Sequence, residues 1–256
     1  MIRQVVKRAI RGMLEAAGYR VYHRTVLPYG IDFMLDIERL SGAWDVPIST
    51  FFDVGANEGQ TSTSALSSFP KARIFAFEPH PVTFSRLVQR LGGDPRVAAH
   101  NLALSNANGF APFFEYSSST LNSLIPDAQY PVRKGVAARE ITVQCKTLDE
   151  FCKQHRIQTI DVLKIDTEGC ELVVLQGARQ LLSTEKIRFV YAEFNDMSPR
   201  PGTTGGALIP VSDFLAPFGF RFVATYPDYM ELGRELHVGA NALFVSPPDC
   251  YGVIGV

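Results

Sequence analysis

The stretch Asp53-Val-Gly-Ala-Asn-Glu-Gly59 constrains the fold of this chain more than any other. An apolar run that ends in Phe51 and Phe52 precedes it, and a run compatible with a helix, residues 60–68, follows it. A strand, a tight glycine turn and a helix in this order are typical of a nucleotide-cofactor site. Asn57 stands where a third glycine would complete the pattern, and asparagine tolerates left-handed backbone angles. The stretch predicts that the cofactor is bound by Asp53, Gly55, Ala56, Asn57 and Gly59.

A second acidic residue, Glu78, ends the strand predicted over residues 73–77, and Pro79 stops that strand. Glu78 lies 19 positions after Gly59, where a carboxylate accepts hydrogen bonds from ribose hydroxyls. This spacing also fits a nicotinamide dinucleotide. A pyrophosphate is disfavoured by nearby anions, however, and this loop carries Asp53 and Glu58. A positively charged sulfonium with an amino-acid tail fits the loop better.

Two further carboxylates follow predicted strands. Asp166 ends the buried run 162–165, with Glu168 close behind it, and Glu193 ends the apolar run 189–192. Ligands in open α/β sheets bind at the carboxyl ends of the strands. We therefore expect Asp166, Glu168 and Glu193 to share one rim of the sheet with Asp53 and Glu78.

Strands and helices alternate along most of the chain, which predicts a mainly parallel sheet with helices on both faces. Strands are predicted at 49–54, 73–77, 97–102, 161–165, 188–193, 220–225 and 240–245, and helices at 60–68, 81–91, 147–155 and 170–182. Extended segments at 110–116 and 140–145 flank a polar loop, 117–136, which is polar enough to line a sugar site or to be plain solvated loop. The proline- and glycine-rich segment 198–210 is predicted to be a loop.

The N-terminal region is set apart by its charge. Residues 1–24 hold six Arg or Lys and one Glu, and residues 2–17 form an amphipathic helical pattern. Such a helix either docks on the domain with a solvated basic face or attaches weakly to an anionic membrane surface or a lipid-linked substrate. A second helix is predicted over residues 31–40. The chain has no apolar stretch of the length that spans a membrane and no signal-peptide pattern.

The bulk composition and the length of 256 residues agree with one globular domain that carries a helical extension. The net charge of −1 gives no reason to expect nucleic-acid binding. The cysteines at 145, 152, 170 and 250 form no Cys-x-x-Cys pair and no zinc spacing. We therefore expect free thiols in a reducing cytoplasm.

Several motifs together resemble the FkbM-type methyltransferases, which use S-adenosylmethionine (SAM). They are Asp53-Val-Gly-Ala-Asn-Glu-Gly59, Phe77-Glu-Pro79, Asn101-Leu-Ala-Leu-Ser105, Leu163-Lys-Ile-Asp-Thr-Glu-Gly-Cys-Glu171, Glu193-Phe194 and Asn241-Ala-Leu-Phe-Val245. The resemblance covers residues 48–246. It implies a Rossmann-like class I fold with a seven-stranded sheet and an antiparallel closing strand, on a domain of residues 48–256 after an extension of residues 1–47. It also implies that Asn101 and Leu102 flank the adenine and that Pro79, next to Glu78, belongs to the cofactor site.

The resemblance further implies O-methylation of a hydroxyl on a sugar or glycoconjugate. The candidate catalytic residues are Asp166, Glu193 and His237, and Asp166 also stands as a cofactor ligand; His80 is a further candidate base. Removal of the hydroxyl proton falls either to a side chain or to a divalent ion such as Mg²⁺, and the metal ligands stay unassigned. Two other classes remain open: a nicotinamide-dependent oxidoreductase, for which no Tyr-x-x-x-Lys pair is found, and a non-catalytic cofactor-binding protein at a membrane.

Overall fold

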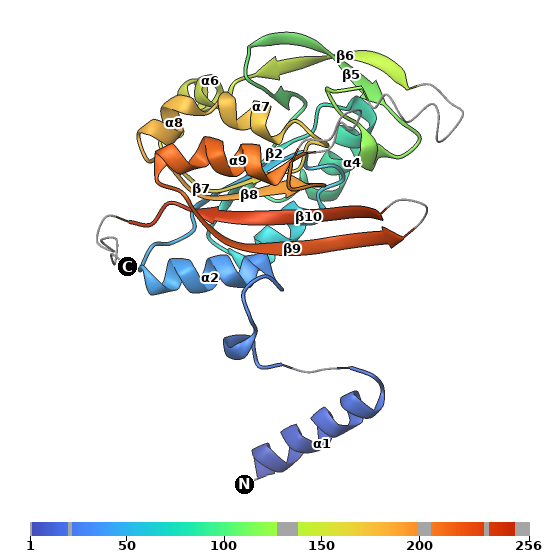
Figure 1. The fold of residues 1–256 in the computed structure, drawn as a ribbon, viewed down its shortest axis with the longest axis vertical. Helices are drawn as coiled ribbons and strands as arrows, with labels where there is room; N and C mark the ends of the chain where they lie inside the picture. The colour runs from blue at the N-terminus through green and yellow to red at the C-terminus, as the bar shows by residue number, and fades with distance from the viewer. Residues whose placement is uncertain (1, 20–21, 127–137, 199–205, 233–235, 249–256) are drawn as a thin grey trace.

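A computed structural model describes residues 2–19, 22–126, 138–198, 206–232 and 236–248 of the chain (Figure 1). Its centre is a seven-stranded sheet in the order β3-β2-β1-β7-β8-β10-β9. The strands are β1 (Thr50–Val54), β2 (Arg73–Phe77), β3 (Val97–His100), β7 (Ile160–Ile165), β8 (Ile187–Phe194), β9 (Arg221–Leu232) and β10 (Leu236–Val245). The predicted Rossmann-like architecture is confirmed.

The strand directions also follow the prediction. β1 pairs in parallel with β2 on one side and with β7 on the other, and β7 pairs in parallel with β8. β10 runs antiparallel to both of its neighbours, β8 and β9. The chain order reverses between β1 and β7, which is the switch point where ligands bind in open α/β sheets.

Helices cover both faces of the sheet, as Figure 1 shows. One face carries α6 (Leu148–His155), α7 (Glu171–Gln176), α8 (Arg179–Ser183) and α9 (Leu208–Leu215), and the other carries α2 (Phe33–Ala43), α3 (Gln60–Ser68) and α4 (Pro81–Leu91). Successive residues of a strand point to opposite faces, so Leu163 and Ile165 of β7 join the first core while Val162 joins the second. Burial of each such side chain contributes about 1.5–3 kcal/mol.

A small second sheet stands beside the carboxyl ends of the central strands. It has the order β4-β6-β5 and consists of β4 (Ala103–Leu104), β5 (Gly109–Glu115) and β6 (Arg139–Lys146). The extended segments predicted at 110–116 and 140–145 are confirmed as β5 and β6, which pair antiparallel. Residues 127–136 of the predicted loop 117–136 lie outside the described residues.

The single helix predicted over 170–182 is wrong, because the structure has two helices, α7 and α8. The break falls at Gly177, where a Cβ would collide with the backbone carbonyl oxygen of Ser105. α8 then begins anew, and the amides of Gln180 and Leu181 donate to the Asp149 carboxylate at 2.9 and 3.0 Å. The Asp149 carboxylate therefore satisfies backbone amides that have no partner inside α8 because the helix begins anew there.

Other observed boundaries also differ from the predicted ones. The strand predicted over 97–102 ends at His100, and residues 103–104 pair with β6 instead. α9 begins at Leu208, inside the loop predicted over 198–210, because Pro210 falls in its first turn, where its missing N–H costs nothing; residues 199–205 of that loop lie outside the described part. The last two strands are longer than predicted, since β9 and β10 continue as a hairpin past the sheet.

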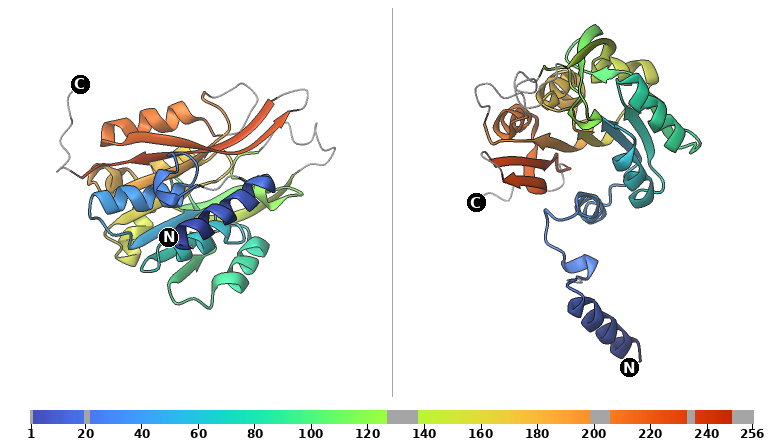
Figure 2. Two further views of the ribbon diagram at one scale, coloured as in Figure 1. Left: turned by 90° about the horizontal axis from the view of Figure 1, so that it is seen from below. Right: turned by 90° about the vertical axis from the view of Figure 1, so that its right-hand side faces the viewer.

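The two predicted N-terminal helices behave differently. α2 begins after Asp32, whose side chain accepts the amide of Leu35 at 3.0 Å, and it buries Met34 and Ile37 in the core. α1 (Ile2–Ala16) lies away from the body in Figure 1 and in the right-hand view of Figure 2. Its apolar residues Ile10 and Met13 are 52% and 75% exposed. In this structure α1 is not docked on the domain.

Within the described residues, Cys145, Cys152 and Cys170 are buried free thiols, which agrees with the prediction for them. No helix in the described ranges is both long and apolar enough to cross a membrane.

Candidate active site

The turn after β1 has the left-handed geometry that the sequence predicts. Gly55, Asn57 and Gly59 have φ values of 72°, 48° and 88°. A Cβ at Gly55 would collide with the backbone carbonyl oxygen of Asp166. Glycine therefore lets the turn approach the end of β7, while asparagine tolerates its left-handed position.

Glu78 lies just beyond β2 and faces this turn. Its carboxylate accepts the amide of Asn57 at 3.0 Å and the amide of His80 at 2.9 Å. Burial raises the pKa of Glu78 to about 7, although the two amides oppose the shift. The Asn101 amide donates to the carbonyls of Glu78 and Pro79, both at 2.9 Å, and so fixes this segment.

A first cavity, of about 100 Å³, opens beside Glu78. Six of the predicted cofactor residues line it: Gly55, Asn57, Glu78, Pro79, Leu102 and Asp166. Ser119 and Thr120, from the segment predicted as a possible sugar-site loop, line this cavity. The Ser119 hydroxyl donates to Asn57 Oδ1 at 3.3 Å. The loop therefore closes over the turn and narrows the cavity below the range typical of ligand sites, about 300–1,000 Å³.

The remaining predicted cofactor residues do not line this cavity. Asp53 is fully buried, and its carboxylate accepts the Ser62 hydroxyl at 2.7 Å. The amide of Ala56 donates to the Phe77 carbonyl, Gly59 stands at the start of α3, and the Asn101 amide is engaged as described above. These four residues shape the turn and its surroundings.

Lys164 links the turn to β7, and no role for it follows from the spacing of the sequence. Its ammonium lies 3.0 Å from Asp53 Oδ1 and 3.4 Å from Asp166 Oδ2, and it donates to the Gly55 carbonyl at 3.0 Å. Burial lowers the pKa of Lys164, but Asp166 and Asp53 outweigh it and hold the pKa above its usual value. The available signal was a lysine inside a buried strand, two residues before Asp166 and on the same face.

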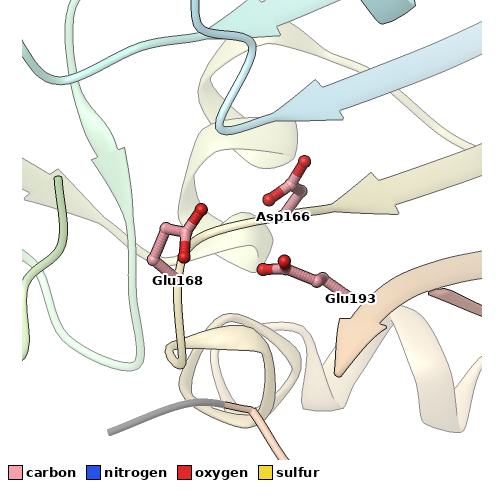
Figure 3. A group of neighbouring side chains, drawn as sticks. All are labelled: Asp166, Glu168 and Glu193. Atoms are coloured by element: carbon pink, nitrogen blue, oxygen red, sulfur yellow. The ribbon is translucent and has the colours of Figure 1, made fainter. Parts of the chain in front are cut away.

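Asp166, Glu168 and Glu193 form an acidic group at the rim, as the sequence predicts. Figure 3 shows the three side chains pointing toward one another from the end of β7, the following loop and the end of β8. One carboxylate oxygen from each lies within 4.8 Å of the others. Glu193 Oε2 is buried and has no hydrogen-bond partner among the described atoms.

Glu168 and Glu193 hold their protons more tightly than ordinary carboxylates do. Burial and then the charge of Asp166 raise the pKa of Glu168 to about 8. Burial and then the charges of Asp166 and Glu168 raise the pKa of Glu193 well above its ordinary value. Like charges crowded in a poorly solvated site produce such shifts, so the group favours a proton or another positive charge.

Glu171 anchors the loop that carries Glu168. Its Oε1 accepts the Thr167 amide at 2.9 Å, the Thr167 hydroxyl at 3.0 Å and the Gly169 amide at 3.2 Å. Glu168 itself has a φ of 54° and Gly169 a φ of 100°. The loop is therefore held in an unusual backbone path that turns Glu168 back toward Asp166.

The histidine predictions have different outcomes. His80 Nδ1 accepts the Thr83 amide at the start of α4, and its other nitrogen lies 3.5 Å from Glu115, so His80 lies outside the acidic group. His237 belongs to β10, but its side chain falls outside the described part of the chain.

A second cavity, of about 600 Å³, lies on the α2 side of the rim. Asp166 borders both cavities. The second cavity also contains Lys164 and the aromatic side chains Phe33, Tyr191 and Tyr226. Two ligands, one in each cavity, would therefore come together beside Asp166.

The sheet order, the antiparallel β10, the glycine turn and Glu78 at the first cavity define a class I methyltransferase that uses SAM. The chain belongs to the FkbM methyltransferase family, because the model of the methyltransferase FkbM domain matches residues 53–222. This membership decides for a methyltransferase and against a nicotinamide-dependent oxidoreductase or a non-catalytic protein.

Three relatives illustrate the family. The 2-O-methyltransferase NoeI of Sinorhizobium fredii is 27% identical over 194 residues, which are 72% of this chain and 77% of NoeI. The 31-O-demethyl-FK506 methyltransferase FkbM of Streptomyces tacrolimicus is 31% identical over 75% of this chain and 79% of its own length. The hexuronic acid methyltransferase AglP of Haloferax volcanii is 32% identical, but the match spans only 56% of this chain and 55% of AglP.

Proposed function

We propose that this enzyme transfers the methyl group of SAM to a hydroxyl oxygen of a sugar or glycoconjugate. The observation that carries the proposal is the position of Asp166 at the border of both cavities. Methyl transfer needs the attacking oxygen, the methyl carbon and the sulfur in line at near-attack distance. A donor in the first cavity and an acceptor in the second satisfy this need. The names of NoeI and AglP support a sugar hydroxyl.

The first cavity receives the nucleoside end of the cofactor in this proposal. Glu78 accepts the ribose hydroxyls, because each of its oxygens has a lone pair left after one backbone amide. Leu102 and Pro79 pack on the adenine, and the turn at Gly55 and Asn57 approaches the methionine part. The positive sulfonium then lies near Asp166. Movement of the loop 117–122 widens the cavity for the ligand.

The acidic group removes the proton of the acceptor hydroxyl. An ordinary carboxylate is a weak base, and a base works best when its pKa lies near the working pH. Glu168 meets this condition with a pKa of about 8, and burial with the neighbouring charges also raises the pKa of Glu193 above its ordinary value. We assign the base to Glu193 or Glu168 and the positioning of the donor to Asp166. His237 stays a candidate base from the sequence.

A divalent cation is a second way to activate the hydroxyl, and the acidic group fits one. Asp166, Glu168 and Glu193 offer hard oxygen ligands within 4.8 Å of one another, and Glu193 Oε2 lacks a partner among the described atoms. A bound Mg²⁺ would lower the pKa of a hydroxyl.

The test is transfer of a labelled methyl group from SAM to a panel of glycans and glycosides. Because Asp166 positions the donor, Asp166→Asn is expected to lower kcat by about 100-fold or more, while Asp213→Asn, an exposed change on α9, leaves it unaltered. A metal-dependent enzyme stops with EDTA and recovers with Mg²⁺; an enzyme with a side-chain base ignores EDTA and slows at low pH. Near-normal turnover of Asp166→Asn, or SAM binding without transfer to any hydroxyl, contradicts the proposal.

We further propose a cytoplasmic enzyme in which α1 makes weak contact with the inner face of a membrane. Two observations support this placement: α1 exposes Ile10 and Met13, and its other side carries Arg8 and Arg11. Anionic lipid complements such a basic amphipathic helix. We divide the chain into an extension, residues 1–47, and a catalytic domain, residues 48–256, with α2 of the extension packed on the sheet.

A further inference from the structure

The two cavities are built from different parts of the chain. All residues that line the first cavity lie between Val54 and Cys170, inside the matched family region. The second cavity takes much of its wall from outside that region, from residues 27–33 before β1 and from residues 226–228 and Asn241 on the last two strands. The flanking segments therefore shape the space that faces the acceptor side of Asp166.

Three aromatic rings give the second cavity an apolar surface. Phe33 and Tyr191 stack with their ring centres 3.9 Å apart, and Tyr226 meets Tyr191 edge-on at 5.4 Å. The Tyr226 hydroxyl donates to the buried Asp36 at 2.8 Å, which fixes this ring. A rigid aromatic surface with a few polar groups is typical of a small-molecule site, and it suits the C–H face of a sugar ring.

Asn241 supplies an unused polar group next to these rings. Its Oδ1 is buried and has no hydrogen-bond partner among the described atoms. In the strand register Asn241 stands opposite Glu193 of β8 and opposite Tyr226 of β9, and such cross-strand neighbours are in contact range. Asn241 therefore stands between the acidic group and the aromatic rings, where it can accept a hydroxyl of a ligand that reaches both.

The charges around this cavity are mainly negative. Asp32, Asp166 and Asp228 line it. Among the described residues, the positively charged side chain that lines it is Lys164, which forms ion pairs with Asp53 and Asp166. Burial and then Asp228, Asp166 and Asp32 raise the pKa of Tyr191, so these carboxylates act on the cavity interior. An anionic ligand would add a further negative charge without a free partner here.

We propose that the second cavity is the acceptor subsite and that it selects an uncharged sugar over a hexuronate. This inference rests on the proposed function. The sugar ring packs on Phe33 and Tyr191, one hydroxyl donates to Asn241 Oδ1, and the hydroxyl to be methylated faces Glu193 and Asp166. The flanking segments, rather than the matched family region, then set the choice of acceptor.

The experiment uses the full-length enzyme, saturated with S-adenosylhomocysteine for the binding measurements and supplied with SAM for the turnover measurements, and two matched families of probes. Uncharged methyl glycosides of hexoses are compared with the corresponding methyl glycosides of hexuronic acids by saturation-transfer NMR and by methyl transfer from SAM. Wild-type enzyme is expected to prefer the uncharged member of each pair by about tenfold or more. An equal or stronger preference for the hexuronates overturns the inference.

Two variants locate the preference. Asn241→Leu is expected to raise the KM of the uncharged glycoside about tenfold without altering binding of S-adenosylhomocysteine. Asp228→Lys, an exposed change, is expected to shift the preference toward the hexuronate about tenfold, and Asp213→Lys on α9 serves as its control. If neither variant alters acceptor use, the cavity is not the subsite. If S-adenosylhomocysteine itself does not bind, the proposed function fails first.

Discussion

Glu78 combines a structural and a ligand-facing position. Its carboxylate holds two backbone amides and borders the first cavity. Glu78→Ala is therefore expected to weaken binding of S-adenosylhomocysteine about ten- to a hundredfold, because a hydrogen bond to a charged group contributes about 1.5–3 kcal/mol. Isothermal titration calorimetry measures the change.

A matched variant separates the two tasks of Glu78. Glu78→Gln keeps an oxygen for one backbone amide but loses the charge, so it should fold well and still bind the ligand less tightly than wild type. Asp53→Ala should also weaken binding, through loss of the Lys164 ion pair rather than of a ligand contact. Wild-type affinity in folded Glu78→Ala would remove Glu78 from the cofactor site.

Glu168 provides a prediction about pH. Its pKa is about 8 in the folded protein and near 4.5 in the unfolded chain, so between these values the folded state holds a proton that the unfolded state has lost. The contribution of Glu168 to stability is therefore full below pH 4.5 and is lost as the pH rises toward 8. Glu168→Gln should raise Tm at pH 8.5 by about 2 °C or more.

The gain in Tm from Glu168→Gln should shrink as the pH is lowered toward 4.5. Scanning calorimetry at several pH values measures this gain. Methyl transfer by the variant should be slower than by the wild-type enzyme. Glu140→Gln, an exposed change on β6, serves as the control. A destabilised Glu168→Gln variant at pH 8.5 would show that the acidic group is already neutralised in solution.

Site residues that end strands could be predicted from the sequence more readily than site residues inside strands. Asp166, Glu193 and Glu78 were predictable because parallel strands end on one rim. Lys164 was not, since its role depends on a partner, Asp53, that is distant in the chain. The burial of Asp53, which removes it from the cavity lining, likewise depends on packing that local pattern does not encode.

Among the elements, the break between α7 and α8 supports a test by glycine substitution. Gly177→Ala places a Cβ against the Ser105 carbonyl and is expected to cost about 2 kcal/mol or more in the free energy of unfolding. Gly42→Ala, in α2, meets no atom within 4 Å and should stabilise by about 0.4–1 kcal/mol. Urea unfolding measures both, and equal effects would refute the steric account of the break.

The core strands were predictable because the pattern of apolar residues and the length of each run both indicate a strand. The five parallel strands β1, β2, β3, β7 and β8 combine apolar runs with turn residues at their ends. The predicted boundaries were wrong where tertiary contacts determine where a helix or strand ends. The α7–α8 break needs Ser105, and the extra length of β9 and β10 comes from hairpin pairing that continues through polar residues and Pro227.

For the whole molecule, α1 supports a deletion test. Removal of residues 2–19 should leave Tm and methyl transfer unaltered, because α1 lies away from the domain and Arg24, which pairs with Glu38 of α2 at 3.0 Å, is retained. Wild-type enzyme should co-sediment at low salt with vesicles that contain phosphatidylserine, and the deletion should abolish this.

The charge of α1 can be tested without its removal. Replacement of Lys7, Arg8 and Arg11 by Gln keeps the apolar face and should remove the dependence on anionic lipid. Vesicles of phosphatidylcholine alone provide the control. Unfolding of the deletion variant would favour a docked α1, and no binding of wild type to anionic vesicles would end the membrane proposal.

The acidic group has a consequence for the catalytic cycle as a whole. The donor carries a positive sulfonium, and the spent cofactor carries a neutral thioether after the methyl group has left. If the sulfur lies near Asp166, as proposed, the acidic group, which favours an added positive charge, attracts the donor more than the spent cofactor. After each turnover the enzyme therefore binds the spent cofactor less tightly than it binds the donor. The same charges that recruit fresh donor thus also limit inhibition by the product.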